Sequence, residues 1–185
     1  MQLDFERKKG CLYVVGTPIG NLADISERAL DVLAEVELVA AEDTRVSGRL
    51  LRHFDIQTPL ISFHEHNVAQ RLPGLLERLA RGTQIALVSD AGMPCISDPG
   101  VDLVRACRER NIEVIVIPGP TAAVTALVGS GLRSDQFTFV GFLPAKGKSR
   151  REALARLLTL TSQSVILYEA PHRLRRTLTD LARIG

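Results

Sequence analysis

The segment IALVSDAGMPCISDPG, residues 85–100, joins a short apolar run to a long polar loop. Residues 85–88 are four consecutive apolar residues, which is typical of a buried strand in a parallel sheet. Ser89 and Asp90 follow at once, so polar groups lie at the carboxyl end of that strand, where open α/β sheets bind ligands. The glycines and prolines that follow exclude helix and regular strand. We therefore expect a ligand-binding loop, since ordinary connections need only about two to six residues.

Three other apolar runs end in polar loops in the same way, and a fourth short run at 60–63 leads to His64. Segments with helical spacing lie between the runs. Five strands that alternate with helices indicate an α/β fold with an open, mostly parallel sheet flanked by helices. The three runs with their loops are residues 11–15 before GTPIGN, residues 38–41 before EDTR, and residues 113–117 before PGPTA.

The chain divides into three parts by pattern. Residues 1–10 are polar and are expected to form a flexible N-terminus. Residues 11–117 form the predicted N-terminal α/β domain. Residues 118–185 contain two strand patterns, 137–142 and 165–168, and helical patterns at 121–128, 151–160 and 173–183. This part is too short for an independent core of ordinary size, so we expect a partial, truncated C-terminal α/β domain.

Bulk composition favours a globular protein without a membrane anchor. The 185 residues are 45% hydrophobic and 24% charged, and no apolar stretch approaches the ~20 residues that span a bilayer. The first residues, MQLDFERKKG, lack the apolar core of a signal peptide, so a cytoplasmic location is expected. The three cysteines form no C-x-x-C pair, which favours reduced, structural thiols.

Positive charge gathers in the C-terminal part. From residue 144 onward there are nine Lys or Arg and three Asp or Glu, whereas residues 1–143 have fourteen and eighteen. This asymmetry favours a polyanionic partner for the C-terminal part, although a solvated basic helix face gives the same pattern.

The motif GFLPAKGKS, residues 141–149, is similar to a P-loop but has the wrong spacing. Five residues, one of them Pro144, separate the first Gly from Gly-Lys-Ser, whereas a P-loop has four. We interpret the segment instead as a mobile basic arm that contacts a sugar-phosphate backbone. The alternative is a flexible linker made soluble by its charge. The cations of this arm are Lys146, Lys148, Arg150 and Arg151.

Other common sites are disfavoured. Gly16 and Gly20 do not fit the G-x-G-x-x-G fingerprint of dinucleotide-binding folds, and the chain has no G-x-S-x-G elbow. His64 and His66 flank Glu65, but catalytic zinc needs three protein ligands and no third ligand is recognisably spaced. We predict no metal site, and we expect these histidines to contact substrate or to lie in a plain loop.

Five motifs together resemble the tetrapyrrole-methylase superfamily in order and spacing over residues 12–185. The resemblance implies S-adenosyl-L-methionine as cofactor, a class III methyltransferase fold with a cleft between two α/β domains, and a homodimer. Members of the family continue beyond the length of this chain, which implies a truncated second domain. The motifs are GTPIGN (16–21), AEDTR (41–45), SDAGMPCISDPG (89–100), PGPTA (118–122) and YEAPHR (168–173).

Within the superfamily, the chain is similar to enzymes that methylate ribosomal RNA. This likeness implies methyl transfer to the ribose 2′-oxygen of a cytidine in the decoding region of 16S rRNA, with 16S rRNA or the small ribosomal subunit as partner. Two alternatives stay open. One is a small-molecule methyltransferase acting on a corrinoid precursor, which the basic arm disfavours; the other is a non-catalytic binding fragment.

The resemblance also implies site residues. A base for the ribose proton is expected among Asp43, Glu169 and His172, with Arg45 and Arg173 on phosphate. The alternative for the two carboxylates is a structural ion pair with these arginines. The residues expected to contact the cofactor are Pro18, Ser89, Asp90, Met93, Ile96, Thr121, Ala122, Leu167 and Tyr168.

Overall fold

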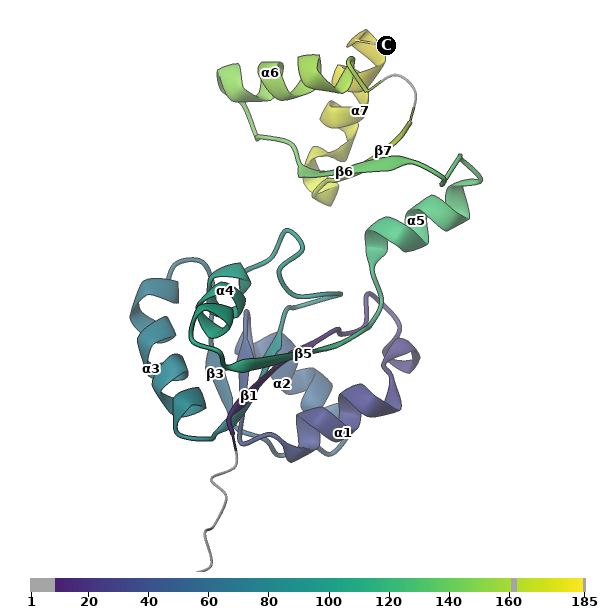
Figure 1. Cartoon of the computed structure of the whole chain (residues 1–185). Helices are drawn as coiled ribbons and strands as arrows, with labels where there is room; N and C mark the ends of the chain where they lie inside the picture. Colours follow the sequence, from purple (N-terminus) through teal and green to yellow (C-terminus); the bar gives the residue numbers. More distant parts are fainter. Residues whose placement is uncertain (1–8, 161–162, 185) are drawn as a thin grey trace, which may run out of the picture. The chain divides into compact units, whose positions relative to one another are not determined.

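The computed structural model describes residues 9–160 and 163–184, and the chain forms two compact units, residues 1–121 and 122–185. In the first unit the five described strands pair in parallel, in the order β3-β2-β4-β1-β5. The predicted parallel α/β sheet is therefore confirmed. Figure 1 labels β1, β3 and β5 of this sheet. The predicted N-terminus, residues 1–10, lies mostly outside the described residues. The strands are β1 (Cys11–Val15), β2 (Leu38–Ala41), β3 (Leu60–Ser62), β4 (Gln84–Val88) and β5 (Glu113–Ile117).

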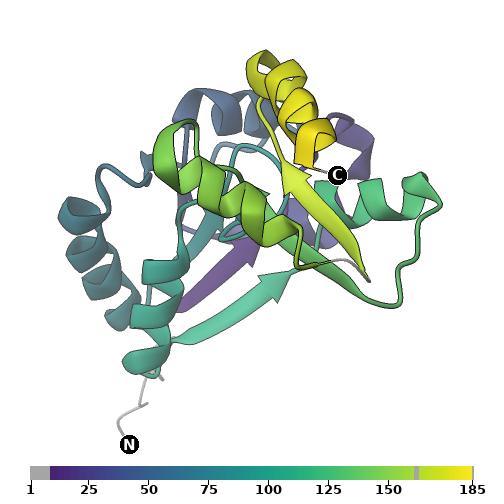
Figure 2. The same ribbon diagram turned by 90° about the horizontal axis from the view of Figure 1, so that it is seen from above.

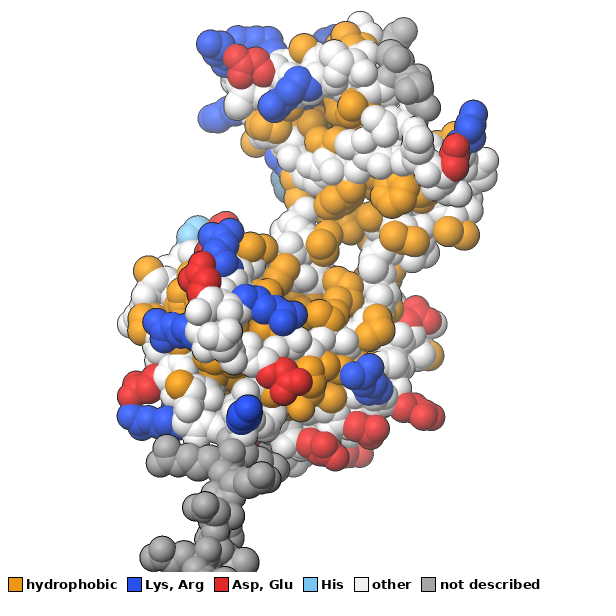
Figure 3. Space-filling view, viewed as in Figure 1, with side chains coloured by type: hydrophobic (Ala, Val, Ile, Leu, Met, Phe, Trp, Pro, Cys, Tyr) orange, Lys and Arg blue, Asp and Glu red, His pale blue; other side chains and the backbone are white. Residues whose placement is uncertain are grey.

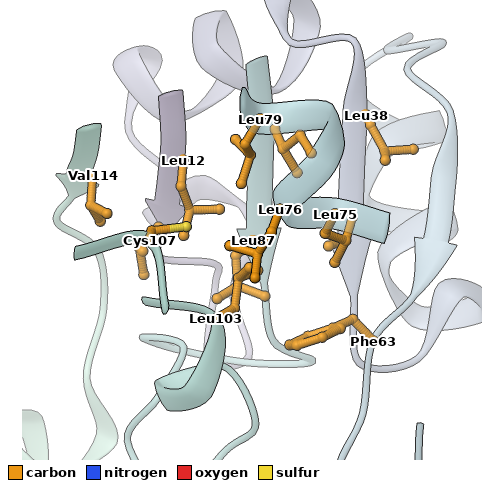
Figure 4. Close-up of a cluster of buried hydrophobic side chains, with 13 residues drawn as sticks. Leu12, Leu38, Phe63, Leu75, Leu76, Leu79, Leu87, Leu103, Cys107 and Val114 are labelled. Atoms are coloured by element: carbon orange, nitrogen blue, oxygen red, sulfur yellow. The ribbon is translucent and has the colours of Figure 1, made fainter. Parts of the chain in front are cut away.

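Helices cover both faces of this sheet, which explains why its strands are continuous apolar runs. Leu12 and Leu87 belong to the buried cluster on the face of α3 and α4, whereas Val15 and Val88 belong to the cluster on the face of α1 and α2. Figure 4 shows the first cluster, with Cys107 among its leucines. The helices are α1 (Glu27–Glu35), α2 (Thr44–His53), α3 (Val68–Ala80) and α4 (Val101–Glu109), with a 3-10 turn η1 (Leu22–Asp24) before α1.

Side-chain caps fix where two helices begin. The Ser26 hydroxyl accepts from the backbone N–H of Ala29 at 3.1 Å, so α1 begins directly after Ser26. The Asp43 carboxylate accepts from the N–H of Arg45 at 2.8 Å and caps α2. Because of this cap, α2 begins at Thr44, two residues beyond the end of β2, and includes Arg45.

The described residues of the second unit form a parallel strand pair, three α-helices and a 3-10 helix. In Figure 2, α6 (light green) and α7 (yellow) lie next to β7, and their apolar residues share a small core around Leu143 and Leu154. The prediction of a mobile basic arm at 146–151 was wrong, because α6 begins at Gly147 and the segment is largely helical. The elements are α5 (Ala122–Ser130), β6 (Phe137–Phe142), α6 (Gly147–Leu157), β7 (Ser164–Tyr168), η2 (Pro171–Arg173) and α7 (Leu174–Ile184).

Large apolar side chains are exposed on the second unit, and hydrophobic atoms are visible on its surface in Figure 3. Across the described residues of both units, no helix is long and apolar enough to cross a membrane. Cys11, Cys95 and Cys107 are free thiols, and burial raises the pKa of Cys107 to about 11. The large apolar residues exposed on the second unit are Val124, Val128, Leu132, Phe137, Val140, Phe142, Leu158, Leu174 and Leu178.

Candidate active site

The loops that follow β1, β4 and β5 are joined by backbone contacts. Thr17 and Gly92 exchange two hydrogen bonds, with N···O distances of 2.9 and 3.0 Å. The N–H of Gly16 donates to the carbonyl of Ile117 at 3.1 Å. At the β2 side, the N–H of Asp43 donates to the Asp90 carboxylate at 3.0 Å. The structure therefore brings four of the five sequence motifs together at the carboxyl edge of one sheet.

Two glycines allow the first and last of these loops to touch. A Cβ added to Gly16 would lie 2.7 Å from the Cα of Gly119 and 2.6 Å from the sulfur of Met93. A Cβ on Gly119 would lie 2.8 Å from the Cα of Gly16. Neither position has room for a side chain, so the backbone approach itself requires glycine at both.

The loop 89–100 contains residues held in the left-handed region. Cys95 and Ser97 have φ angles of 72° and 60°, although neither is glycine. Gly100 has φ 128°, and a Cβ there would lie 2.7 Å from a Leu87 methyl carbon. A left-handed conformation costs about 1–3 kcal/mol at a non-glycine residue such as Cys95 or Ser97. It persists only where the surrounding structure holds it in place, which is common at ligand sites.

A cavity of about 220 Å³ opens between the end of β4, the loop after β1, and α2. Ser89 is only 2% exposed, and within the described part of the chain its Oγ has no hydrogen-bond partner inside 3.5 Å. The Ser89 hydroxyl nevertheless interacts with the Asp98 carboxylate and opposes the rise that burial causes in the pKa of Asp98. The neighbouring Asp90 is exposed. The lining is Thr17, Pro18, Leu22, Val46, Ser47, Arg49, Leu50, Ser89 and Asp90.

A second, more open hollow lies over the ends of β2 and β4 and includes Glu42, His64, Cys95 and Asp98. Burial raises the pKa of Glu42, and the nearby Asp98 and Asp90 carboxylates raise it further. Burial also raises the pKa of Asp98. No three His, Cys, Asp or Glu side chains in the described ranges, 9–160 and 163–184, are placed to hold a metal ion.

Asp43 is held by Arg45. The Arg45 Nε donates to both carboxylate oxygens, at 3.0 and 3.1 Å, and the Arg45 side chain is 88% exposed. Hydrogen bonds from the Arg45 side chain and backbone hold the pKa of Asp43 well below its usual range. The structure thus contains the ion pair that sequence analysis gave as the alternative to a base.

Three arginines line one side of α2, and sequence analysis missed two of them. Arg45, Arg49 and Arg52 border a shallow hollow of about 550 Å³, together with Asp43, Thr44 and Val46. Arg49 also lines the 220 Å³ cavity, so the two hollows share it. The signal was the i, i+4, i+7 spacing of arginines in TRVSGRLLRH, which contains no acid.

In the second unit, Glu169 and its neighbours form a closed polar network. The Glu169 carboxylate accepts from Thr177 Oγ1 at 2.6 Å, from the N–H of Ala170 at 2.8 Å and from Arg173 at 2.7 Å. The hydrogen bond from Thr177 leads the contacts that lower the pKa of Glu169, whose side chain is only 6% exposed. Here too the ion pair that was the alternative reading is present.

Arg150 belongs to the same network, which corrects the expectation of an exposed cation at this position. It is 3% exposed, and its guanidinium donates to Asp180 at 2.8 and 3.0 Å. It also donates to Thr177 Oγ1 at 2.8 Å and to the carbonyl of Pro144 at 3.0 Å. An external phosphate cannot reach it unless these contacts break.

The comparisons with known proteins identify the family. A family model for the tetrapyrrole (corrin/porphyrin) methylases matches residues 11–184. The chain belongs to this family. It is 57% identical over 172 residues to the ribosomal RNA small subunit methyltransferase I of Synechocystis sp. and 52% identical over 179 residues to that of Escherichia coli O157:H7. These matches cover 93% and 97% of this chain but only 61% and 62% of the relatives, so the chain spans about three fifths of their length.

Solved structures support the fold of this tetrapyrrole methylase chain. Diphthine synthase superposes with a TM-score of 0.70 at 14% identity, over 94% of this chain and 72% of the other. Uroporphyrin-III-C-methyltransferase from Thermus thermophilus gives a TM-score of 0.54 at 25% identity, over 81% and 74%. The predicted class III methyltransferase architecture is therefore confirmed, whereas individual roles of residues are not tested by these likenesses.

The residues expected to contact cofactor in this methylase chain fall in both units. Six lie at the carboxyl edge of the first unit: Pro18, Ser89, Asp90, Met93, Ile96 and Thr121. Ala122 begins α5, and Leu167 packs into the core of the second unit. Tyr168 stacks edge-on against Phe139 and Phe142, with centroid distances of 4.8 and 5.5 Å.

The remaining predicted residues differ in exposure. Lys146, Lys148 and Arg151 are exposed at the start of α6, and the Lys148 Nζ lies 3.7 Å from Glu152. His172 is exposed in η2. Arg173 is more covered because it pairs with Glu169. Of the four cations expected on RNA at 146–151, three are thus accessible and one is internal.

Proposed function

We propose that the protein, at its full natural length, is an S-adenosylmethionine-dependent methyltransferase that methylates the ribose 2′-oxygen of a cytidine in the decoding region of 16S rRNA. The observation that carries the proposal is the identity of 57% and 52% to ribosomal RNA small subunit methyltransferases I over more than nine tenths of this chain. The basic residues exposed on α6 support an RNA substrate.

The residues at the carboxyl edge fit the proposed cofactor. S-adenosylmethionine, when bound, supplies a methyl group attached to a positively charged sulfonium. The exposed Asp90 carboxylate can balance that charge, and the buried Ser89 hydroxyl, which otherwise interacts with Asp98, can hydrogen-bond a polar group. Pro18, Met93 and Ile96 offer apolar surface beside them. Thr121, Ala122, Leu167 and Tyr168 complete the proposed contacts.

The protein's part in the transfer is chiefly alignment of the ribose oxygen with the methyl carbon. Asp43, Glu169 and His172 are the proposed acceptors of the ribose proton. Asp43 and Glu169 each pair with an arginine and have lowered pKa values, which makes them weak bases while those pairs persist. His172 is exposed, so it is the preferred candidate of the three.

The proposed partner is 16S rRNA or the small ribosomal subunit, and a cytoplasmic setting follows from that substrate. Arg45, Lys146, Lys148, Arg151 and Arg173 are proposed to contact its phosphates. Arg150 was part of the same prediction, but its burial favours a structural role. The homodimer implied by the family resemblance remains a prediction.

The cofactor site is tested by calorimetric titration of the full-length protein with S-adenosylmethionine. Asp90→Asn keeps an acceptor for the Asp43 N–H but removes the charge, so we expect the Kd to rise at least about tenfold. Asp90→Ala should weaken binding further.

The matched control carries Lys148→Ala and Arg151→Ala. We expect it to bind S-adenosylmethionine as the parent does, but to bind RNA more weakly and with a shallower salt dependence. Equal loss of cofactor and RNA binding in this control contradicts separate cofactor and RNA contacts.

A second candidate function is methylation of a small corrin-like molecule. The likeness to uroporphyrin-III-C-methyltransferase, 25% identical with a TM-score of 0.54, favours it. An assay with tritiated S-adenosylmethionine, supplied in parallel with small ribosomal subunits and with uroporphyrinogen III, separates the two. Label in RNA supports the first proposal, and label in the tetrapyrrole supports the second. Cofactor binding without label in either favours a non-catalytic binding role.

A further inference from the structure

The arginine side of α2 stands out because it is basic within an acidic part of the chain. Residues 1–143 have four more acids than bases, yet α2 has three arginines and a histidine and no acid. Within the described residues, no ion pair or hydrogen bond of the side chains of Arg49 or Arg52 is found, and both are exposed. Two neighbouring cations without partners are available to an anionic ligand.

The cavity next to this side of α2 suits a small flat group. Its volume of about 220 Å³ is below the ~300–1,000 Å³ of pockets for drug-sized ligands, and it has apolar walls from Pro18, Val46 and Leu50. Thr17, Ser89 and Asp90 supply the polar groups of this lining. A single pyrimidine base, apolar on its faces and polar on its edge, matches this lining.

Strand order places the cavity on one side of the proposed cofactor contacts. α2 follows β2, whereas Thr121 follows β5, and β4 and β1 lie between those two strands. Pro18, Ser89 and Asp90, which follow β1 and β4, line the cavity and are also proposed cofactor contacts. An acceptor oxygen must approach the methyl carbon where the two sites meet.

We propose that the 220 Å³ cavity receives the flipped-out base of the target nucleotide, and that Arg49 and Arg52 hold phosphates of the single-stranded RNA beside it. The inference rests on the proposed function, because it names the place where the RNA substrate binds. Arg45 adds a third cation whose charge Asp43 partly balances. Arginine suits this role because its planar guanidinium binds phosphate with two hydrogen bonds.

The phosphate contacts are tested with a double variant, Arg49→Ala with Arg52→Ala, in the full-length protein. The probe is a short fluorescent single-stranded RNA from the decoding region of 16S rRNA, followed by anisotropy at several KCl concentrations. We expect the Kd to rise at least about tenfold, and the slope of log K against log salt to become shallower by about 1.4, because two phosphate contacts are lost.

The matched control is Arg71→Ala with Arg78→Ala. These exposed arginines lie on α3, which covers the opposite face of the sheet from α2. We expect this control to bind RNA with the affinity and salt slope of the parent. Equal weakening in both double variants means that α2 contributes only general positive charge, and that result overturns the proposed phosphate contacts.

The base pocket is tested with Val46→Phe, which fills the cavity from the first turn of α2. We expect kcat/KM for RNA methylation to fall at least about tenfold while the Kd for S-adenosylmethionine stays unchanged. Unchanged methylation overturns the base pocket. Lost cofactor affinity overturns it as well, since the cavity then belongs to the cofactor.

Arg49→Glu provides a second variant if Val46→Phe does not fold, because Arg49 is exposed and its change leaves the core intact. It should weaken RNA binding more than Arg49→Ala does, through repulsion of phosphate. Absence of methyl transfer by the parent protein is a separate result, which contradicts the proposed function. Normal transfer with unaffected variants contradicts only the RNA site on α2.

Discussion

Glu42 and Glu169 occupy the same place in the two units, directly after the last residue of a parallel strand, yet their surroundings are opposite. Glu42 follows β2 and lies near three other carboxylates, so burial and repulsion raise its pKa. Glu169 follows β7 and accepts hydrogen bonds from Thr177, Ala170 and Arg173, which lower its pKa.

The two strand ends differ in how far their charged groups are paired within the protein. At the carboxyl edge of the first unit, acidic side chains are crowded, and Arg49 and Arg52 are exposed. At the end of β7, Arg150, Thr177, Asp180 and Glu169 satisfy one another. The charged groups at the first strand end are therefore available to a ligand, whereas those at the second pair with one another and hold α6 and α7 together.

Removing the cation at the centre of the second network should have the largest effect. We expect Arg150→Ala to lower the free energy of unfolding by about 3 kcal/mol, since Asp180 and Thr177 lose a buried partner. Urea denaturation followed by circular dichroism measures this change. The neighbouring Arg151→Ala is the control, because Arg151 is exposed and its loss should stay within about 0.5 kcal/mol. Similar values for both variants contradict a structural role for Arg150.

Glu169→Gln should have a smaller effect of the same sign, about 1 kcal/mol at pH 7. Because the folded-state pKa of Glu169 is lowered, its ionised form stabilises the protein above its ordinary value of 4.5, and that stability is lost as the pH falls through the folded pKa. The loss in the variant should therefore shrink on acidification. A constant difference between pH 7 and pH 3 means that the charge of Glu169 is not the cause.

Glu42→Gln should have the smallest effect, and the opposite sign. The folded-state pKa of Glu42 is raised, so its neutral form is favoured below 4.5 and the carboxylate becomes destabilising as the pH rises through the folded pKa. We expect the variant to be more stable than the parent at pH 7 and equal to it at pH 4. Thermal unfolding at the two pH values checks this, and a variant that is less stable at pH 7 refutes the assignment.

Much of the fold could be predicted from sequence because its signals are local. Apolar runs followed by polar loops predicted the five strands, and the helical segments between them predicted their parallel pairing. The start of α6 was misplaced by four residues because Gly147 and Ser149 give weak helix signals and the first turn has no apolar residue. The junction loops were found for the same reason as the strands, since each directly follows one.

The roles of individual charged side chains could not be predicted in the same way. Arg150 and Arg151 are neighbours in a basic segment, yet one is 3% exposed and the other lies on the surface. Arg150 faces Asp180, which is thirty residues away in sequence. Likewise, Arg49 is a candidate for ligand binding only because folding places it in the same cavity lining as Ser89 and Asp90.

The sequence by itself determined the parallel sheet, the membership of the tetrapyrrole methylases and the loops at the carboxyl edge, because periodicity, turn residues and motif order act over short stretches of chain. The tertiary structure alone decided which charges are neutralised and which are exposed. The pairing, burial and pKa of a charged side chain depend on groups that are distant in sequence and adjacent in space. A local sequence pattern therefore does not predict them.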